Sequence, residues 1–219
     1  MRNGEIIFTS YGLGQVEYTP NGRARINPYP RIYDRVKDAI IDGKPHMHDK
    51  EIKYIKDILK PHHKVFEWGS GGSTIYFSQF VDTYISIENL RIWAELVRQR
   101  LLTDKFSDNE KMSHNNCSIH YVPEMNLHQF DRGSMKQSIY FKEYLSAIDK
   151  FDIPRYDVIL IDGMARPGCV YKAFQYTDDK SVILFHDYFK YKEYRWLDKK
   201  LDIERPIPEC SLVIVKGKK

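Results

Sequence analysis

Short apolar runs alternate with longer amphipathic stretches along most of the chain, and this alternation limits the fold more than any other feature of the sequence. The run YDVILID at 156–162 is apolar at consecutive positions, which is typical of a strand buried on both faces of a sheet. Stretches such as RIWAELVRQRLL at 91–102 instead repeat their apolar residues at helical spacing. Strands that alternate with helices predict an α/β layer fold with a mainly parallel sheet.

The individual elements and the domain division follow from the same pattern. Strands are predicted at 64–67, 82–88, 118–122, 156–162, 181–187 and 211–217, with a poorly marked strand near 201–204. Helices are predicted at 31–41, 48–60, 74–80, 91–102, 139–148, 169–176 and 191–200. The first thirty residues are rich in glycine, proline and polar residues, which indicates an irregular arm or short hairpin laid over the domain. We therefore expect an N-terminal arm and first helix at 1–45, followed by one compact α/β domain at 46–219.

The stretch VFEWGSGGSTIYF at 65–77 holds three of the chain's 12 glycines, at Gly69, Gly71 and Gly72. Glycines concentrated in this way allow a sharp turn and let another group approach the backbone closely. Between a strand and a helix of an α/β fold, such a loop is typical of a nucleotide-cofactor site. In these sites an acidic residue at the end of the next strand binds ribose hydroxyls, and here that residue is Glu88.

The residues around the glycines narrow the choice of cofactor. A phosphate-binding Walker loop requires a lysine that this stretch lacks. A dinucleotide fingerprint fits at Gly69 and Gly71, but Thr74 stands where close helix–strand packing favours a smaller residue. Glu67, just before the loop, would repel a diphosphate.

The E-x-G-x-G-G pattern that begins at Glu67 resembles motif I of the class I S-adenosylmethionine-dependent methyltransferases. The resemblance extends from about residue 49 to residue 219, because Glu88, VILIDGMAR at 158–166 and VILFHDY at 182–188 follow in the family's order. The DGxxR sequence, a following cysteine and the later DY resemble small methyltransferases of sugars and natural products. These include glycan-modifying enzymes of bacterial polysaccharide clusters and large DNA viruses.

The resemblance implies a Rossmann-like class I methyltransferase fold, in which a seven-stranded, mainly parallel sheet has helices on both faces and an antiparallel last strand. It implies S-adenosyl-L-methionine as the cofactor, with the carboxylate before the glycines facing the positively charged methionine end. The cofactor-binding residues would be Glu67, Trp68, Gly69, Ser70, Gly71, Gly72, Ser73, Thr74, Glu88 and Asn89.

Asp162 ends one predicted strand, and His186 and Asp187 end the next. Because ligands of open α/β sheets lie beyond the carboxyl ends of the strands, we expect these three residues to form the catalytic group. Methyl transfer from a sulfonium to an alcohol requires an acceptor held in line and removal of its proton, which any of the three could accept. Asp162 could instead cap its loop, and His186 could instead be a hydrogen-bonded core residue.

Paired carboxylates also suit Mg²⁺ or Mn²⁺, which would lower the pKa of a bound alcohol. Metal-dependent O-methyltransferases that resemble this class place acids at these two strand ends. The sequence identifies no third carboxylate or amide ligand, so it leaves metal dependence open.

Two residues near these strand ends are candidates for substrate binding. Arg166 could clamp a phosphate or carboxylate of the substrate, or form a salt bridge within its own loop. Tyr188 begins a series of aromatic residues interleaved with basic ones, which suits sugar faces, single-stranded nucleic acid or an ordinary amphipathic helix. The loop at 46–48 either folds over the cofactor or lies on the surface, and Glu124 or Met125 would lie near the adenine.

Composition restricts the function classes only loosely. A net charge of +4 permits an acidic partner but does not call for nucleic acid. No apolar run reaches the roughly 20 residues of a membrane span, and the first ten residues lack the long apolar stretch of a secretory signal peptide. Three cysteines without the spacing of a disulfide framework or zinc site are expected to be reduced, so we expect a cytoplasmic protein.

These patterns favour S-adenosylmethionine-dependent O-methylation of a hydroxyl on a sugar or glycan. Methylation of RNA or of another small metabolite is an alternative activity. A cofactor-binding subunit without catalysis is an alternative from a different class, and the sequence does not indicate an oligomeric state.

Overall fold

The computed structural model describes residues 6–9, 12–18, 24–28, 37–105, 116–123 and 141–217, and its strands form two sheets. The larger sheet contains β4 (Lys64–Trp68), β5 (Thr83–Glu88), β6 (Cys117–Tyr121), β7 (Val158–Ile161), β8 (Val182–Phe185), β9 (Leu201–Glu204) and β10 (Val213–Gly217). The described helices are η1 (Lys37–Ile41), α2 (Asp49–Ile58), α3 (Gly72–Phe77), η2 (Ser78–Phe80), α4 (Arg91–Lys105), α6 (Lys142–Leu145), η3 (Ser146–Lys150), α7 (Arg166–Ala173), η4 (Phe174–Tyr176) and η5 (Lys192–Lys199).

The seven strands of the larger sheet lie in the order β6-β5-β4-β7-β8-β10-β9. The first five pair in parallel, whereas β10 is antiparallel to both of its neighbours. The strand order reverses between β4 and β7, which leaves a crevice at the carboxyl ends of these strands. The predicted seven-stranded, mainly parallel sheet with an antiparallel last strand is confirmed, including the short strand at 201–204.

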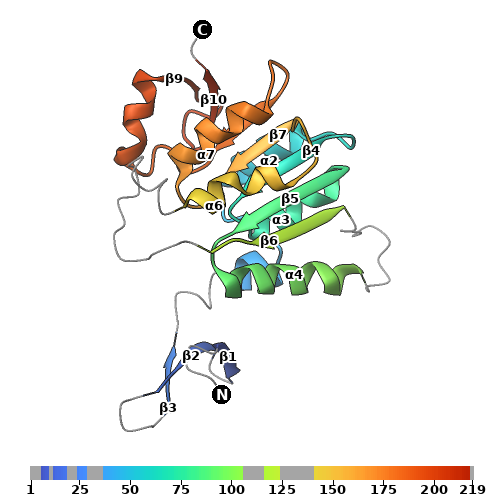
Figure 1. Ribbon diagram of the computed structural model, residues 1–219, viewed down its shortest axis with the longest axis vertical. Coiled ribbons are helices and arrows are strands. Elements are labelled where there is room, and N and C mark those ends of the chain that lie inside the picture. Colours follow the sequence, from blue (N-terminus) through green and yellow to red (C-terminus); the bar gives the residue numbers. More distant parts are fainter. Residues whose placement is uncertain are drawn as a thin grey trace.

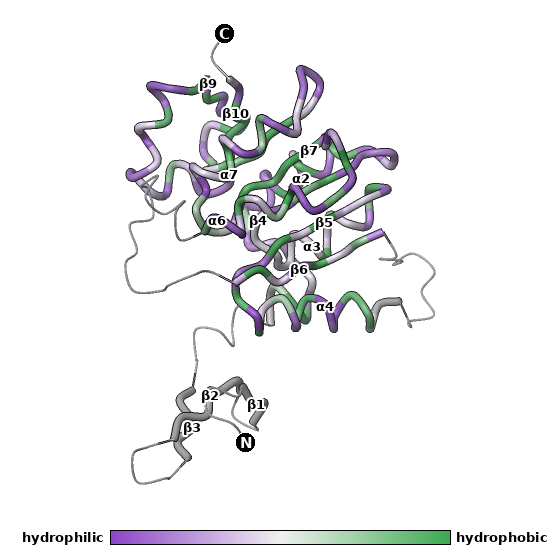
Figure 2. Tube along the Cα trace, in the orientation of Figure 1, coloured by the Kyte–Doolittle hydropathy of each residue, from purple (hydrophilic) through white to green (hydrophobic). Residues whose placement is uncertain are grey.

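Helices cover both faces of this sheet (Figure 1). Successive side chains of a strand point to opposite faces, so Ile159 and Ile161 of β7 pack with residues of α6, α7 and η5, whereas Val158 and Leu160 pack with residues of α2 and α3. All four side chains are at most 1% exposed. Hydrophobic residues accordingly concentrate in the central strands, and hydrophilic ones in the outer loops (Figure 2). This two-sided burial explains the consecutive apolar residues of the strand.

Three helix predictions differ from the structure in kind. The stretch predicted as a helix at 191–200 is the 3₁₀-helix η5, whose buried residues Tyr194 and Leu197 lie three apart, as one 3₁₀ turn requires. The helix predicted at 139–148 is one α-helical turn, α6, followed by the 3₁₀-helix η3, with 139–140 outside the described residues. Of the helix predicted at 31–41, only η1 is described, and it is a π-helix. In the part of the chain that the structure describes, no helix combines the length and apolar character of a membrane-crossing segment.

The N-terminal segment is more regular than its composition indicates. Strands β1 (Ile6–Thr9), β2 (Gly12–Tyr18) and β3 (Ala24–Pro28) form a three-stranded antiparallel sheet in that order. The described residues of this segment, 6–9, 12–18 and 24–28, therefore form neither an irregular arm nor a single hairpin. The division of the chain at residue 45 stays a prediction.

Candidate active site

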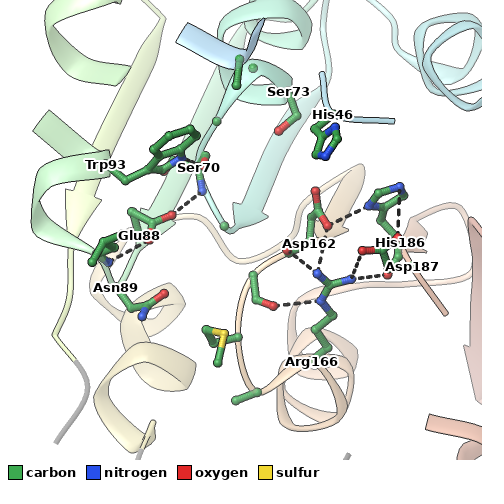
Figure 3. A pocket seen from close by; sticks show the side chains of 18 of the residues that line it. His46, Ser70, Ser73, Glu88, Asn89, Trp93, Asp162, Arg166, His186 and Asp187 are labelled. Carbon is green, nitrogen blue, oxygen red and sulfur yellow. Dashed lines mark hydrogen bonds and ion pairs between the residues drawn. The ribbon is translucent and has the colours of Figure 1, made fainter. Parts of the chain in front are cut away.

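A cavity of about 430 Å³ opens at the carboxyl ends of β4, β5, β7 and β8, where the strand order reverses. Its walls include the glycine loop after β4, the end of β5 with the start of α4, and the segments after β7 and β8 (Figure 3). Ligand pockets of proteins typically enclose about 300–1,000 Å³. The cavity therefore has the size of a ligand site and the position at which α/β sheets bind ligands.

The three glycines of the loop are required for different reasons. Gly69 has a φ of +103°, and a Cβ there would lie 2.5 Å from the backbone nitrogen of Gly163. A Cβ on Gly72 would lie 2.0 Å from a backbone oxygen of the segment before α2. A Cβ on Gly71 would meet nothing closer than the Trp93 side chain at 3.6 Å, and Gly71 lines the cavity. The fold itself therefore requires glycine at positions 69 and 72, whereas Gly71 leaves room for a ligand.

Glu67 lies beneath the glycine loop. Its fully buried carboxylate accepts hydrogen bonds from the hydroxyls of Ser73 at 2.5 Å, Thr74 at 2.5 Å and Ser86 at 2.7 Å. Burial raises the pKa of the Glu67 carboxyl to about 7, although the three hydroxyls favour its charged form. Because these donors already occupy the carboxylate, Glu67 supports the loop from below and does not line the cavity, contrary to the prediction that it faces the cofactor.

Glu88, at the end of β5, lines the cavity as predicted. Its two carboxylate oxygens accept hydrogen bonds from the backbone nitrogens of Ser70 at 3.1 Å and Leu90 at 2.8 Å. Burial raises the pKa of the Glu88 carboxyl to about 8. Trp93 of α4, which the sequence reasoning missed, lines the cavity and donates through Nε1 to the carbonyl oxygen of Ser70 at 2.6 Å. The shape of the glycine loop is thus fixed by β5 and α4.

An ion pair between Asp162 and His186 connects the end of β7 with the end of β8 (Figure 3). Nδ1 of His186 lies 2.8 Å from Oδ1 of Asp162, and Nε2 lies 3.4 Å from Oε2 of Glu51. Burial alone would lower the pKa of His186, but the two carboxylates outweigh it and raise this pKa to about 10. His186 is therefore a cation at neutral pH with both ring nitrogens occupied. The predicted role of general base is not available to it.

Glu51 of α2 belongs to no motif that the sequence analysis identified. It is buried, and its Oε1 accepts hydrogen bonds from the backbone nitrogens of Ser211 at 2.9 Å and Leu212 at 2.8 Å. Burial would raise the pKa of its carboxyl, but the hydrogen bonds from His186 and the backbone hold it below the ordinary value. The other oxygen of Glu51 accepts a hydrogen bond from the backbone nitrogen of His48. The sequence around Glu51 therefore indicates a helix-capping residue and gives no sign of its contact with His186.

The guanidinium of Arg166 is held by groups at the ends of β7 and β8. Its guanidinium donates to the carbonyl oxygens of Gly163 and Asp162, each at 2.8 Å, and to the carbonyl oxygen of His186. It also lies 3.1 Å from Oδ1 of Asp162. Burial would raise the pKa of the Asp162 carboxyl, but His186 and Arg166 hold it below its usual range. Of the two roles left open by the sequence, the structure supports the salt bridge within the loop, and the guanidinium locks the segments after β7 and β8 together.

Asp187 presents its carboxylate to the cavity from the turn after β8. Its φ is +61°, which is uncommon for a residue other than glycine. Its Oδ2 lies 3.1 Å from Nζ of Lys190 and 3.9 Å from Nη1 of Arg166, and its Oδ1 lies 4.0 Å from Nε2 of His186. Such backbone strain beside a cavity is typical of functional residues. The three residues predicted as the catalytic group do therefore meet at one wall.

The same three residues are the candidate metal ligands. One ligand atom from each of Asp162, His186 and Asp187 lies within 4.8 Å of the other two. Both ring nitrogens of His186 face carboxylates, however, and the guanidinium of Arg166 lies 3.1 Å from Oδ1 of Asp162. A divalent cation would have to displace the proton of His186 and share Asp162 with a second cation, so the residues as arranged do not fit a metal.

Tyr188 is a core residue. Its side chain is fully buried, its hydroxyl donates to Oδ1 of Asp198 at 2.5 Å, and its ring packs against Phe185 at 5.3 Å. The prediction that Tyr188 binds substrate is therefore wrong, because the turn after β8 directs its ring into the core. Tyr191 and Tyr194 line the cavity instead.

The remaining predicted residues divide by their distance from the cavity. Seven of the predicted cofactor residues line it: Gly69, Ser70, Gly71, Gly72, Ser73, Glu88 and Asn89. Trp68 and Thr74 are fully buried and, like Glu67, do not line it. His46 lines the cavity, whereas Met47 packs against the core and the side chain of His48 caps α2. Glu124 and Met125 lie outside the described residues.

The sequence and the fold were compared with those of known proteins. No protein-family model matches the chain, and a search of the curated proteins finds no match. A methyltransferase-like protein from Silicibacter pomeroyi superposes with a TM-score of 0.59 at 21% identity, over 80% of this chain and 91% of that one. A putative caffeoyl-CoA O-methyltransferase from Staphylococcus aureus gives a TM-score of 0.56 at 13% identity, over 87% of this chain and 93% of that one. The chain has the class I methyltransferase fold.

An O-methyltransferase from Bacillus cereus, solved in complex with SAH, shares this fold with a TM-score of 0.55 at 11% identity, over 81% of this chain and 86% of that one. At these identities the likeness concerns the arrangement of the strands and helices. Which chemistry the class I methyltransferase fold carries in this chain depends on the cavity and its residues.

Proposed function

We propose that the chain is an S-adenosylmethionine-dependent O-methyltransferase that acts on a hydroxyl group of a sugar or glycan. The observation that carries the proposal is the composition of the cavity at the strand ends. One half offers an open glycine loop and the carboxylate of Glu88, and the other half offers charged and aromatic side chains that follow β7 and β8. The solved structures with the same fold include O-methyltransferases, which supports the proposal.

The half of the cavity beside the glycine loop suits S-adenosylmethionine better than a dinucleotide. Gly71 leaves the backbone open to a ligand, and Glu88 can accept hydrogen bonds from ribose hydroxyls. None of the described residues that line this half is a lysine or arginine, so the diphosphate of a dinucleotide would find no cation there. S-adenosylmethionine supplies, when bound, a methyl group on a sulfonium whose departure leaves a neutral thioether.

The charges of the other half are balanced once Glu51 is counted, which contacts His186 but does not line the cavity, and this balance favours a neutral acceptor. Three carboxylates and three cations each lie within 4.0 Å of an opposite charge: Glu51, Asp162, Asp187, His186, Arg166 and Lys190. No surplus positive charge is left in this set to hold a phosphate or carboxylate of the acceptor. A sugar hydroxyl is therefore favoured over RNA.

Aromatic and acidic side chains at this wall suit a sugar. Tyr191 lines the cavity, and its ring packs edge-on against Tyr194 at 5.8 Å between ring centres. Such a ring can cover the apolar C–H face of a sugar. Lys190 donates to Oδ2 of Asp187, so Oδ1 can accept a hydrogen bond from the acceptor hydroxyl, which would orient the oxygen for attack.

The first test is calorimetric titration of the protein with S-adenosylmethionine, with SAH and, separately, with NAD⁺. We expect the first two to bind and NAD⁺ not to bind. Binding of NAD⁺ alone, or of none of the three, would overturn the cofactor assignment.

The second test is transfer of tritiated methyl from S-adenosylmethionine to a panel of methyl glycosides and to RNA, with and without EDTA. We expect glycoside methylation that survives EDTA. Methylation of RNA alone would overturn the acceptor class, and cofactor binding without any transfer would support a non-catalytic subunit. A loss of transfer in EDTA would show that a metal is required after all.

A further inference from the structure

Most side chains of the cavity wall that can carry a proton have partners within the chain. Asp162 and His186 form an ion pair with each other, Glu88 accepts two hydrogen bonds from the backbone, and Asp187 forms an ion pair with Lys190. His46 differs from them. It lines the cavity and is exposed, and no partner for its imidazole occurs among the residues that the structure describes. It is therefore a proton acceptor that the fold itself does not use.

The backbone on both sides of His46 is anchored, so its Cα has a defined place beside the cavity. Gly43, with a φ of +58°, makes the turn after η1, and the backbone nitrogen of Met47 donates to the carbonyl oxygen of Pro45 at 2.8 Å. The side chain of Met47 packs against the core, and the segment just before His46 packs closely against Gly72 of the glycine loop. Such anchoring on both sides is what positions a catalytic side chain.

The imidazole faces both halves of the cavity. Figure 3 shows His46 between Ser73 of the glycine loop and the pair formed by Asp162 and His186. His46, Ser73 and Asp162 all line the same cavity. A methyl group carried past the glycine loop toward Asp162 would therefore travel beside His46.

We propose that His46 is the general base of the methyl transfer, a role that rests on the proposed function. The acceptor hydroxyl oxygen forms a bond to the methyl carbon while the carbon–sulfur bond breaks and its electron pair stays on the sulfur. The hydroxyl proton passes to a ring nitrogen of His46, and from the exposed imidazolium it leaves to water. The products are the methyl ether, SAH and one proton, so the reaction balances without another reactant.

Asp187 suits this step less well, although it lies at the same wall. Its carboxylate has three cationic neighbours within 4.0 Å, on Lys190, Arg166 and His186, which neutralise its charge. A carboxylate held in this way can orient a hydroxyl through a hydrogen bond. His46 has no such cation fixed against it among the described residues and can release the proton directly to solvent.

The kinetic test compares His46→Gln with His62→Gln, a matched change at an exposed histidine just before β4, far from the strand ends. With a glycoside that the wild-type protein methylates, we expect kcat of His46→Gln to fall at least ~10²-fold, the range of general base catalysis. Its affinity for SAH should be unchanged, its acid limb in the pH–rate profile should disappear, and imidazole added to His46→Ala should restore turnover. His62→Gln should behave as wild type.

Wild-type kcat in His46→Gln, or a loss without rescue by imidazole in His46→Ala, would overturn the role of His46 and leave the proposed function standing. Failure of the wild-type protein to methylate any acceptor would overturn the proposed function, and the role of His46 would fall with it.

A second measurement needs no acceptor. In protein labelled with ¹³C at histidine Cε1, the resonance of His46, assigned by its loss in His46→Gln, should shift when SAH is added, and that of His62 should not. A His46 resonance that does not respond to SAH would overturn the proposal, because a general base must lie beside the transferred methyl group.

Discussion

Alanine substitutions in the glycine loop separate what the fold requires from what the ligand requires. Gly69→Ala would place a Cβ between 2.5 and 2.8 Å from three backbone atoms of the loop after β7, at a φ of +103°. A positive φ costs an L-residue about 1–2 kcal/mol, and the overlap adds about 1–3 kcal/mol. For a protein of this size 1 kcal/mol lowers Tm by about 2–4 °C. We therefore expect Tm of Gly69→Ala to fall by about 4–20 °C.

Gly71→Ala is the matched comparison. Gly71 has an extended backbone with a φ of 173°, and its Cβ would meet only the Trp93 side chain, at an ordinary contact distance of 3.6 Å. We expect its Tm to stay near that of the wild type. The added methyl group enters the cavity, so the affinity for SAH should fall at least ~10-fold, or ~1.4 kcal/mol.

Thermal unfolding and calorimetric titration of both variants give the result. Wild-type Tm in Gly69→Ala would refute the packing argument for position 69. Wild-type affinity for SAH in Gly71→Ala would refute the idea that the open loop cradles the cofactor.

Three further substitutions test the charged residues of the site. Glu51→Gln leaves the buried His186 cation with one carboxylate fewer and should cost up to about 3–5 kcal/mol of unfolding free energy, measured by urea denaturation; a midpoint equal to that of the wild type would contradict this. The pKa of His186 is raised from about 6.5 in an unfolded chain to about 10. The contribution of His186 to stability should therefore be complete below about pH 6.5 and be lost as pH rises through about 10. The decline of Tm over this pH range should be smaller in Glu51→Gln than in the wild type. Glu88→Ala should weaken SAH binding at least ~10-fold, whereas Glu95→Ala, on the exposed face of α4, should not; equal affinities would remove Glu88 from the site. Asp187→Asn should lower turnover about 10²-fold with SAH binding and Tm retained, because asparagine also tolerates a positive φ; undiminished turnover would show that Asp187 does not orient the acceptor.

The sheet could be predicted because its signals are local. Burial on both faces requires consecutive apolar residues, and β4, β7 and β8 carry that pattern within four or five positions. The weakest prediction of a strand, near 201–204, succeeded because the class I methyltransferase fold requires an element there. The 3₁₀-helix η5 was missed because an apolar residue every third position also suits an α-helix.

The position of the site could be predicted, but the partners of its side chains could not. Topology alone brings the ends of β4, β5, β7 and β8 together, so Glu88, Asp162 and Asp187 were placed correctly at the cavity wall. The partner of His186 on its Nε2 side is Glu51, from a helix that precedes the glycine loop. Tyr188 was misplaced because its direction depends on the left-handed turn at the preceding residue, and nothing in the sequence signals that turn.

These pairings change what the motifs mean. A buried guanidinium must be neutralised and hydrogen-bonded, and Arg166 meets both demands with Asp162 and the backbone of its own loop. The Asp and Arg of the DGxxR sequence thus have a role in the fold, and by themselves they do not indicate an anionic substrate. Groups that have no structural partner within the chain are the ones that can indicate which acceptor binds. Among the described residues of this cavity the imidazole of His46 is such a group, and it belongs to none of the strand-end motifs, whereas the open backbone at Gly71 is part of the glycine motif after β4.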